Sequence, residues 1–216
     1  MISVRRTISL LFIGIVFLSP TSSDEVLANQ FNEGANTFVM TLTKDAIINL
    51  TGKNITYNQR QENLRTILKS YFDVSGIGKW VLGRYWRKAS AAERKEYLSL
   101  FEDLLVNTYA ARFKNYSNEK VKLTGTASRG QTAIVKSVIE RKGLNPVRVD
   151  WRVNFPDGEY KVFDIVVEGV SMIQTQRSEF SSVIRRNGGN ISGLITMLKN
   201  KASSANRSEE RRVGKE

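Results

Sequence analysis

The chain contains no cysteine, no histidine and only three prolines among its 216 residues. Without histidine or cysteine it cannot build a Ser-His-Asp or Cys-His nucleophilic system or an ordinary zinc site, which excludes most hydrolase functions. A phosphate-binding glycine loop is also missing, because NGGNISG (residues 187–193) lacks both a preceding strand and a Lys-Ser/Thr pair. A fold without disulfides depends on its apolar core, and a hydrophobic content of 41% is sufficient for one domain with such a core.

Long apolar runs are scarce, and the clearest one lies near the start of the chain. It extends over eleven residues from Ile8 to Leu18 and follows the basic pair Arg5-Arg6. This length is too short for a membrane-spanning helix but fits the apolar region of a secretory signal. We therefore predict a signal peptide over residues 1–28, cleaved after Ser23 or Ala28, with an uncleaved membrane anchor as the alternative. Export of a chain without cysteine favours the periplasm of a bacterial envelope.

The last ten residues, RSEERRVGKE (207–216), lack apolar periodicity, and one codon choice for them reproduces a widely used sequencing adapter. We interpret them as a read-through tail, expect them to be disordered, and place the folded domain at residues 29–206. The net charge of +12 falls to about +9 when this tail and residues 1–23 are removed. Such a balance favours a membrane surface or lipid headgroups as partners. Export argues against nucleic acid as a partner.

Two periodicities divide the chain. Apolar residues at spacings of three and four predict helices over 30–50, 58–71, 90–115, 175–187 and 191–201, with a short helix before Gly83 that carries Ile77, Trp80 and Val81. Alternating residues predict strands over 120–128, 131–141, 147–155 and 159–168, joined by short turns. Ser90 and Glu93 form a capping box at the start of the longest helix. Its apolar stripe is broad, which predicts burial on more than one side.

Short connections between the strands indicate an antiparallel meander. The fourth strand has apolar residues on both faces, so it is either buried on both sides or lines a cavity. We therefore predict a single α+β domain, with a curved four-stranded antiparallel sheet packed against several helices around an apolar interior. Periodicity alone favours a filled core over a ligand pocket, since a pattern of side chains does not reveal a void.

Carboxylates could still support an enzyme without histidine. Asp150 and Asp164 lie within predicted strands, and Tyr109 or Tyr160 could polarise a carbonyl. No motif pairs these groups, and Asp150 alternates onto the same face as Arg148 and Arg152. An ion-pair role for Asp150 is therefore the better interpretation, and we predict that the protein is not an enzyme.

Two longer segments carry ordered motifs. The first begins YFDVSGIGKWVLGRYW and contains a Phe-Asp start, a Leu-Gly-x-x-Trp turn and a helix with Phe-x-x-Leu-Leu and Thr-Tyr. The second, DIVVEGVSMIQTQRSEF, contains a late strand, a Gly-Val-Ser turn and an Arg-x-x-Phe helix. Together, over roughly residues 30–200, these segments resemble the MlaC-type, or toluene-tolerance, family of periplasmic phospholipid-binding proteins.

This resemblance implies that the helices and the sheet enclose an apolar cavity, and that the protein is a monomeric carrier that holds phospholipid there as cargo. Such a carrier needs no cofactor and moves between the inner and outer membranes. Its implied partners are an inner-membrane ABC transporter complex with an MCE domain and an outer-membrane lipoprotein complex. The side chains we expect to face the lipid lie on the long helix and the strands: Phe101, Leu105, Tyr109, Val149, Trp151, Val153, Phe163, Ile165 and Val167. Arg84 and Arg177 are weaker candidates for a headgroup phosphate. An NTF2-like small-ligand binder or enzyme and an envelope adaptor with a filled core remain alternatives.

Overall fold

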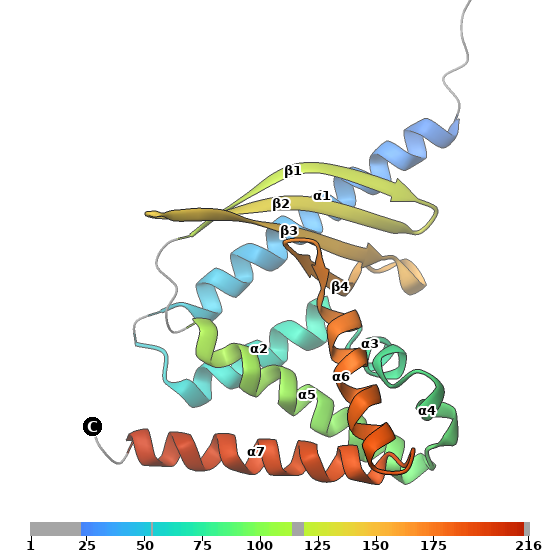
Figure 1. Ribbon diagram of the computed structural model, residues 1–216. Helices are drawn as coiled ribbons and strands as arrows, with labels where there is room; N and C mark the ends of the chain where they lie inside the picture. Colours follow the sequence, from blue (N-terminus) through green and yellow to red (C-terminus); the bar gives the residue numbers. More distant parts are fainter. Residues whose placement is uncertain (1–22, 53, 114–118, 214–216) are drawn as a thin grey trace, which may run out of the picture.

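The protein was described from a computed structural model, which covers residues 23–52, 54–113 and 119–213, with side chains from residue 26 to residue 204 within these ranges. Seven α-helices are described in Figure 1: α1 (Ser23–Leu50), α2 (Tyr57–Tyr71), α3 (Val74–Leu82), α4 (Arg84–Lys88), α5 (Ala91–Phe113), α6 (Met172–Arg186) and α7 (Ser192–Val213). Five strands lie between α5 and α6: β1 (Lys120–Arg129), β2 (Thr132–Arg141), β3 (Leu144–Asn154), β4 (Lys161–Val167) and β5 (Val170–Ser171). A short 3-10 turn, Pro156–Gly158, connects β3 to β4.

Local side-chain caps fix where the helices begin. The capping box predicted at Ser90 is confirmed, because the Glu93 amide donates to Ser90 Oγ at 3.2 Å and the Ser90 amide donates to Glu93 Oε2 at 2.8 Å. A second capping box joins Thr56 and Gln59 at the start of α2. Gly83 ends α3 as predicted, with a φ of 57° that favours glycine. The chain then forms the short helix α4, where only a turn was expected.

The sheet is an antiparallel meander with the strand order β1-β2-β3-β4-β5. The predicted α+β architecture is confirmed, but the sheet has five strands and not four. The fifth strand is only two residues long, and pairs Val170 with Val167 after a tight turn. Register shifts bend β1, β2 and β3, including one between Arg152 and Val153 where β3 pairs with β4.

The helices cover one face of this sheet and enclose two apolar cores. In Figure 1, α1 crosses behind the sheet, α2 and α5 lie below it, and α7 is the outermost helix. The first core lies between the sheet, α1, α2 and the second half of α5, where Val106 and Ala110 are buried. The second core lies between α3, α5, α6 and α7, and contains Tyr97 and Phe101. The prediction that the long helix is buried on more than one side is thus confirmed.

The first and last helices have different bounds from those predicted above. The last helix continues to Val213, so the expectations that it ends near residue 201 and that residues 207–213 are disordered were wrong. Residues 1–22 of the predicted signal peptide lie outside the described residues, and α1 begins at Ser23. Within the described ranges, none of the helices combines the length and the apolar character needed to cross a membrane.

Candidate functional site

An apolar cavity of about 360 Å³ lies within the first core, between the sheet and the helices. Its walls come from the second half of α1, from α2, from the C-terminal half of α5, from the inner face of the sheet and from the first turn of α6. Representative lining residues are Leu42, Ala46 and Leu50 of α1, Leu64, Ile67 and Leu68 of α2, Leu105, Tyr109 and Phe113 of α5, and Met172 and Ile173 of α6. A volume of this size falls within the range of ligand-binding pockets, which is about 300–1,000 Å³.

Only a few polar side chains reach the cavity wall. The hydroxyl of Thr43 donates to the carbonyl oxygen of Met40 at 2.9 Å, so it is bonded within its own helix. Arg112, in the last turn of α5, is exposed, and its guanidinium lies 5.1 Å from the centre of the Tyr109 ring. Asp164 is buried, and its carboxylate is bonded as described below. Among the described residues, the wall therefore presents one exposed cation beside an otherwise apolar surface.

Asp164 joins three elements at one end of the cavity. Its Oδ2 accepts from Ser171 Oγ at 2.7 Å and from Arg152 Nη1 at 3.0 Å, and its Oδ1 accepts from the Ile173 amide at 3.2 Å. These bonds hold the start of α6 against β4, and the adjacent side chains of Met172 and Ile173 form part of the wall. A carboxylate with this many donors is engaged in holding structure together, which argues against the general-base alternative.

The arginines of the outer sheet face have different partners from those expected. We predicted ion pairs between Asp150 and Arg148 or Arg152. Arg148 instead pairs with Glu168 at 3.3 Å, and Arg152 pairs with Asp164 at 3.0 Å. The reason is that cross-strand neighbours come from β4 and the turn after it, which periodicity within β3 alone does not reveal.

Trp151 presents an apolar ring to the cavity because its polar atom is bonded elsewhere. The indole Nε1 donates to Ser137 Oγ at 3.0 Å, and Ser137 Oγ donates to the carbonyl oxygen of Val149 at 2.9 Å. Ser137 is buried, so this pair of bonds satisfies polar groups that would otherwise be costly inside a core. The indole therefore contributes area to the wall without leaving an unpaired donor.

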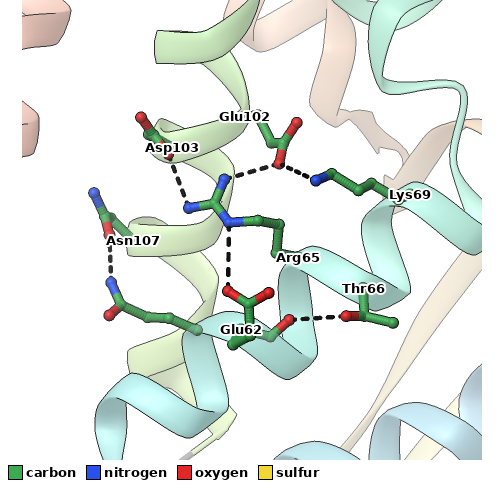
Figure 2. Close-up of polar contacts among 8 residues, drawn as sticks. Glu62, Arg65, Thr66, Lys69, Glu102, Asp103 and Asn107 are labelled. Atoms are coloured by element: carbon green, nitrogen blue, oxygen red, sulfur yellow. Dashed lines mark hydrogen bonds and ion pairs between the residues drawn. The ribbon is translucent and has the colours of Figure 1, made fainter.

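A cluster of charged residues holds two walls of the cavity together from outside. Figure 2 shows Arg65 of α2 between Glu102 and Asp103 of α5, with N–O distances of 2.8 and 2.9 Å. Lys69 also approaches Glu102, at 3.6 Å. Burial lowers the pKa of Arg65, but hydrogen bonds and attraction to the two carboxylates outweigh it and raise the pKa overall. This cluster fixes the spacing between α2 and α5.

Six of the nine apolar site residues expected from the sequence line this cavity: Leu105, Tyr109, Val149, Trp151, Ile165 and Val167. The other three are placed elsewhere. Phe101 is buried in the second core against Tyr97 and Phe180, with ring centres 5.8 and 6.2 Å away. Val153 is fully buried in the first core beyond the cavity wall, and Phe163 packs against the second core.

Neither arginine suggested for a headgroup lies on the cavity wall. The guanidinium of Arg177 lies 4.6 Å from the centre of the Trp80 ring, and its Nη1 donates to the Trp80 carbonyl oxygen at 3.0 Å. Arg84 covers the ring of its neighbour Tyr85 and donates to that hydroxyl at 3.0 Å. Both side chains therefore pack against aromatic residues of α3 and α4.

Sequence reasoning missed Arg112 and the whole contribution of α1 and α2. A signal for Arg112 was present, because it follows Tyr109 by three residues on one face of α5. Leu42, Ala46 and Leu50 also recur at helical spacing, but that pattern is identical for a filled core. In the part of the chain that the structure describes, no group of acidic residues is placed to hold a metal ion.

Residues 41–200, about three quarters of the chain, match the family described as MlaC protein. The chain belongs to the MlaC family. The resemblance found in the sequence motifs is thereby confirmed. This MlaC-family chain is 30% identical over 149 residues to the intermembrane phospholipid transport system binding protein MlaC of Haemophilus influenzae, covering 65% of this chain and 69% of the relative.

Two further relatives extend the comparison. The toluene tolerance protein ttg2D of Pseudomonas putida is 24% identical over 140 residues, which cover 64% of this MlaC-family chain and 65% of that protein. The chain thus spans about two thirds of the length of both sequence relatives. The solved structure of a phospholipid-binding protein from Ralstonia solanacearum, in complex with a phospholipid, superposes with a TM-score of 0.73 at 22% identity. The superposition covers 79% of this chain and 98% of the Ralstonia solanacearum chain, and it establishes that the two share a fold.

Proposed function

We propose that this MlaC-family protein is a phospholipid carrier that holds acyl chains in the cavity and moves lipid between two membranes. The observation that carries the proposal is the apolar cavity of about 360 Å³ in a chain of this family. The names of the relatives support it, since one is a phospholipid transport binding protein and another was solved with phospholipid bound.

The physical need for a carrier follows from the hydrocarbon of the cargo. Two acyl chains contain about 30 methylene groups, and exposing them to water costs on the order of 20 kcal/mol. The cavity wall replaces water with aliphatic and aromatic side chains from α1, α2, α5 and the sheet. The acyl chains of the lipid need no specific polar contact. This agrees with the cavity wall, where the buried carboxylate of Asp164 is already hydrogen-bonded within the protein.

The headgroup is proposed to lie at the exposed end of the cavity, near Arg112. This residue combines a cation with a position on the cavity wall, while the aromatic ring of Tyr109 supports its guanidinium. A guanidinium can donate two parallel hydrogen bonds to a phosphate, which suits a lipid whose tails point inward. Arg112 thus replaces Arg84 and Arg177 as the candidate phosphate ligand.

The cellular setting is part of the same proposal. We place the mature chain in the periplasm after removal of a signal peptide that ends at Ser23 or Ala28, and treat residues 207–216 as read-through. Loading and unloading would occur at an inner-membrane ABC transporter complex with an MCE domain and at an outer-membrane lipoprotein complex. No covalent chemistry is proposed, in agreement with the bonding of Asp164.

Native mass spectrometry of protein purified from a periplasmic fraction tests this function. We expect a mass increment equal to one diacyl phospholipid, and the mass of the polypeptide itself identifies the cleavage site. Ala46→Trp places an indole in the cavity and should abolish the increment. Ala111→Trp adds the same group at an exposed position of α5 and should leave the increment unchanged.

Circular dichroism confirms that each variant is folded before its lipid content is compared. Arg112→Glu should keep the fold and lower phospholipid occupancy, because the substituted carboxylate repels the phosphate. Wild-type protein that is lipid-free in every preparation would refute the carrier function. Equal occupancy in the Ala46→Trp and Ala111→Trp variants would show that the lipid binds outside the cavity.

A further inference from the structure

One end of the sheet extends beyond the cavity as a free hairpin. The pairing of β3 with β4 begins at Val149 and Val167, so residues 144–148 of β3 have no partner in β4. The β2–β3 hairpin projects past the other strands at the left of Figure 1. Ile139, on the same hairpin, lines the cavity, and Lys142 at the turn is three residues further along, or about 10 Å. The hairpin tip therefore lies beside the rim of the cavity.

Exposed apolar side chains gather around this rim. Leu144 at the hairpin turn has an exposed fraction of 63%, the highest among the large exposed hydrophobic residues described. Val170 is 53% exposed and pairs directly with Val167 of the cavity wall. Ile48 is 61% exposed and follows Ile47, which also lines the cavity. Apolar side chains in water at three separate elements around one opening indicate a contact surface.

The same rim is positively charged. Within the described ranges, residues 119–122, 139–148 and 167–168 at this end of the sheet contain five cations and three acidic residues, and Arg112 of the cavity wall adds a sixth cation. The cations are Arg112, Lys120, Lys122, Arg141, Lys142 and Arg148, and the acidic residues are Glu119, Glu140 and Glu168. Lys122 pairs with Glu140 at 2.7 Å, and Arg148 pairs with Glu168 at 3.3 Å, so the remaining charge is carried mainly by the other cations.

We infer that this rim docks directly on an anionic phospholipid bilayer, with the β2–β3 hairpin and the β4–β5 turn as its contact points. The inference rests on the proposed carrier function and adds the surface that holds the carrier at each membrane while the partner complexes load and unload its lipid. Basic residues beside exposed aliphatic residues are the pattern by which proteins bind the interface of anionic membranes. Docking by the rim would place the cavity opening against the headgroups. Exchange with the partner complexes would then take place with the cavity opening held at the membrane surface.

Flotation with lipid vesicles tests the inference on the mature protein. We expect binding to vesicles of phosphatidylethanolamine with phosphatidylglycerol, and little binding to vesicles of phosphatidylcholine. Lys142→Glu should weaken binding to the anionic vesicles at least about fivefold, and Leu144→Gln about tenfold. Binding should also fall in roughly 0.5 M salt, where the Debye length is about 4 Å.

Two control variants carry the same chemical changes at positions away from the rim. Lys201→Glu, on the exposed side of α7, changes the net charge as Lys142→Glu does, and Met40→Gln replaces another exposed apolar residue. Both should bind the anionic vesicles as the wild type does. Equal losses for Lys142→Glu and Lys201→Glu would overturn the inference, because binding would then follow net charge and not this surface.

The lipid content of the same preparations separates the two proposals. Wild-type protein that carries phospholipid but does not float with anionic vesicles would overturn the docking inference and leave the carrier function intact. Protein that floats but never carries phospholipid would refute the carrier function. If the rim variants lose lipid transfer between membranes in cell envelopes but bind vesicles as the wild type does, the rim binds a protein partner, and the membrane inference fails.

Discussion

Replacing Asp164 with alanine should release the start of α6 from the sheet. The side chain of Asp164 is fully buried and accepts from Arg152, Ser171 and the Ile173 amide. Alanine leaves two part-buried donors, Ser171 Oγ and the Ile173 amide, without this acceptor and removes one ion pair whose arginine is partly exposed. We expect the free energy of unfolding to fall by about 3–4 kcal/mol. For a domain of this size, that corresponds to a drop in Tm of about 10 °C.

Urea unfolding of lipid-free protein, followed by circular dichroism, measures this loss without a contribution from bound cargo. Ser171→Ala removes one of the three donors and also the side-chain cap of α6, because Ser171 Oγ accepts from the Gln174 amide at 3.2 Å, so it should cost about 2 kcal/mol. Asp164→Asn retains an acceptor but not the charge, so its cost should lie between those of the two alanine variants. If Asp164→Ala is no more destabilising than Ser171→Ala, the carboxylate does not join these elements, and the reasoning is refuted.

Three other predictions concern the helices around the cavity. The Tyr71 hydroxyl donates to Asp45, and this bond, together with burial, raises the pKa of Tyr71 from 10.0 to about 12. The stabilisation that this hydrogen bond provides is therefore fully present below pH 10 and is lost as the pH rises through 12. Tyr71→Phe should show a smaller fall in Tm over this pH range than the wild type. An equal fall would contradict the bond between Tyr71 and Asp45. Arg65→Met should lower the free energy of unfolding by about 1–2 kcal/mol, since the arginine is only 28% exposed and bonds two carboxylates. Urea titrations in low and high salt check this, and a loss that does not shrink in high salt would exclude an ion-pair origin. Phe101→Ala should cost about 3–4 kcal/mol in the same titrations, yet leave the phospholipid content of the folded protein unchanged, because Phe101 does not line the cavity. Lipid-free but folded Phe101→Ala protein would contradict that placement.

The periodicity of α5 shows how far the sequence determines the site. Phe101 and Leu105 lie four residues apart on one helical stripe, so both were expected to face the same pocket. The structure places α5 between two cores, and its apolar stripe passes from one core to the other along its length. Which residue faces which core depends on where α3, α6 and α7 pack, and those contacts are between segments distant in sequence.

The strands illustrate a second limit. Alternation predicted the inward direction of Val149 and Trp151 correctly, because a strand places every second side chain on the same face. It failed to separate Val153 from them, since the register shift after Arg152 changes the geometry of the last part of β3. The two-residue strand β5 and the continuation of α7 carry too few apolar residues to produce a detectable pattern.

The cavity itself was not predictable from periodicity, because a wall residue and a core residue have the same spacing. The family resemblance supplied that expectation. Arg112 shows the same limit for a charged side chain, since an arginine at the end of a helix is common and its position over Tyr109 at the cavity rim is a property of the folded chain.

The separation of the two cores bears on how the protein survives without cargo. A closed void of about 360 Å³ would cost about 9 kcal/mol by comparison with engineered cavities, which is similar to the whole stability of many domains, and the opening at the rim lowers this cost. The buried residues of the second core, apart from Ile77, do not line the cavity, so Tyr97, Phe101 and Phe180 make their packing contacts outside the volume that lipid would fill. Lipid that fills the cavity supplies the packing contacts that the wall residues lack when it is empty, and these contacts contribute to the affinity for the lipid. Substitutions that reduce the volume of the cavity should therefore stabilise the lipid-free protein and lower its affinity for lipid. The stability of the empty protein and its affinity for lipid thus depend on the same volume in opposite directions.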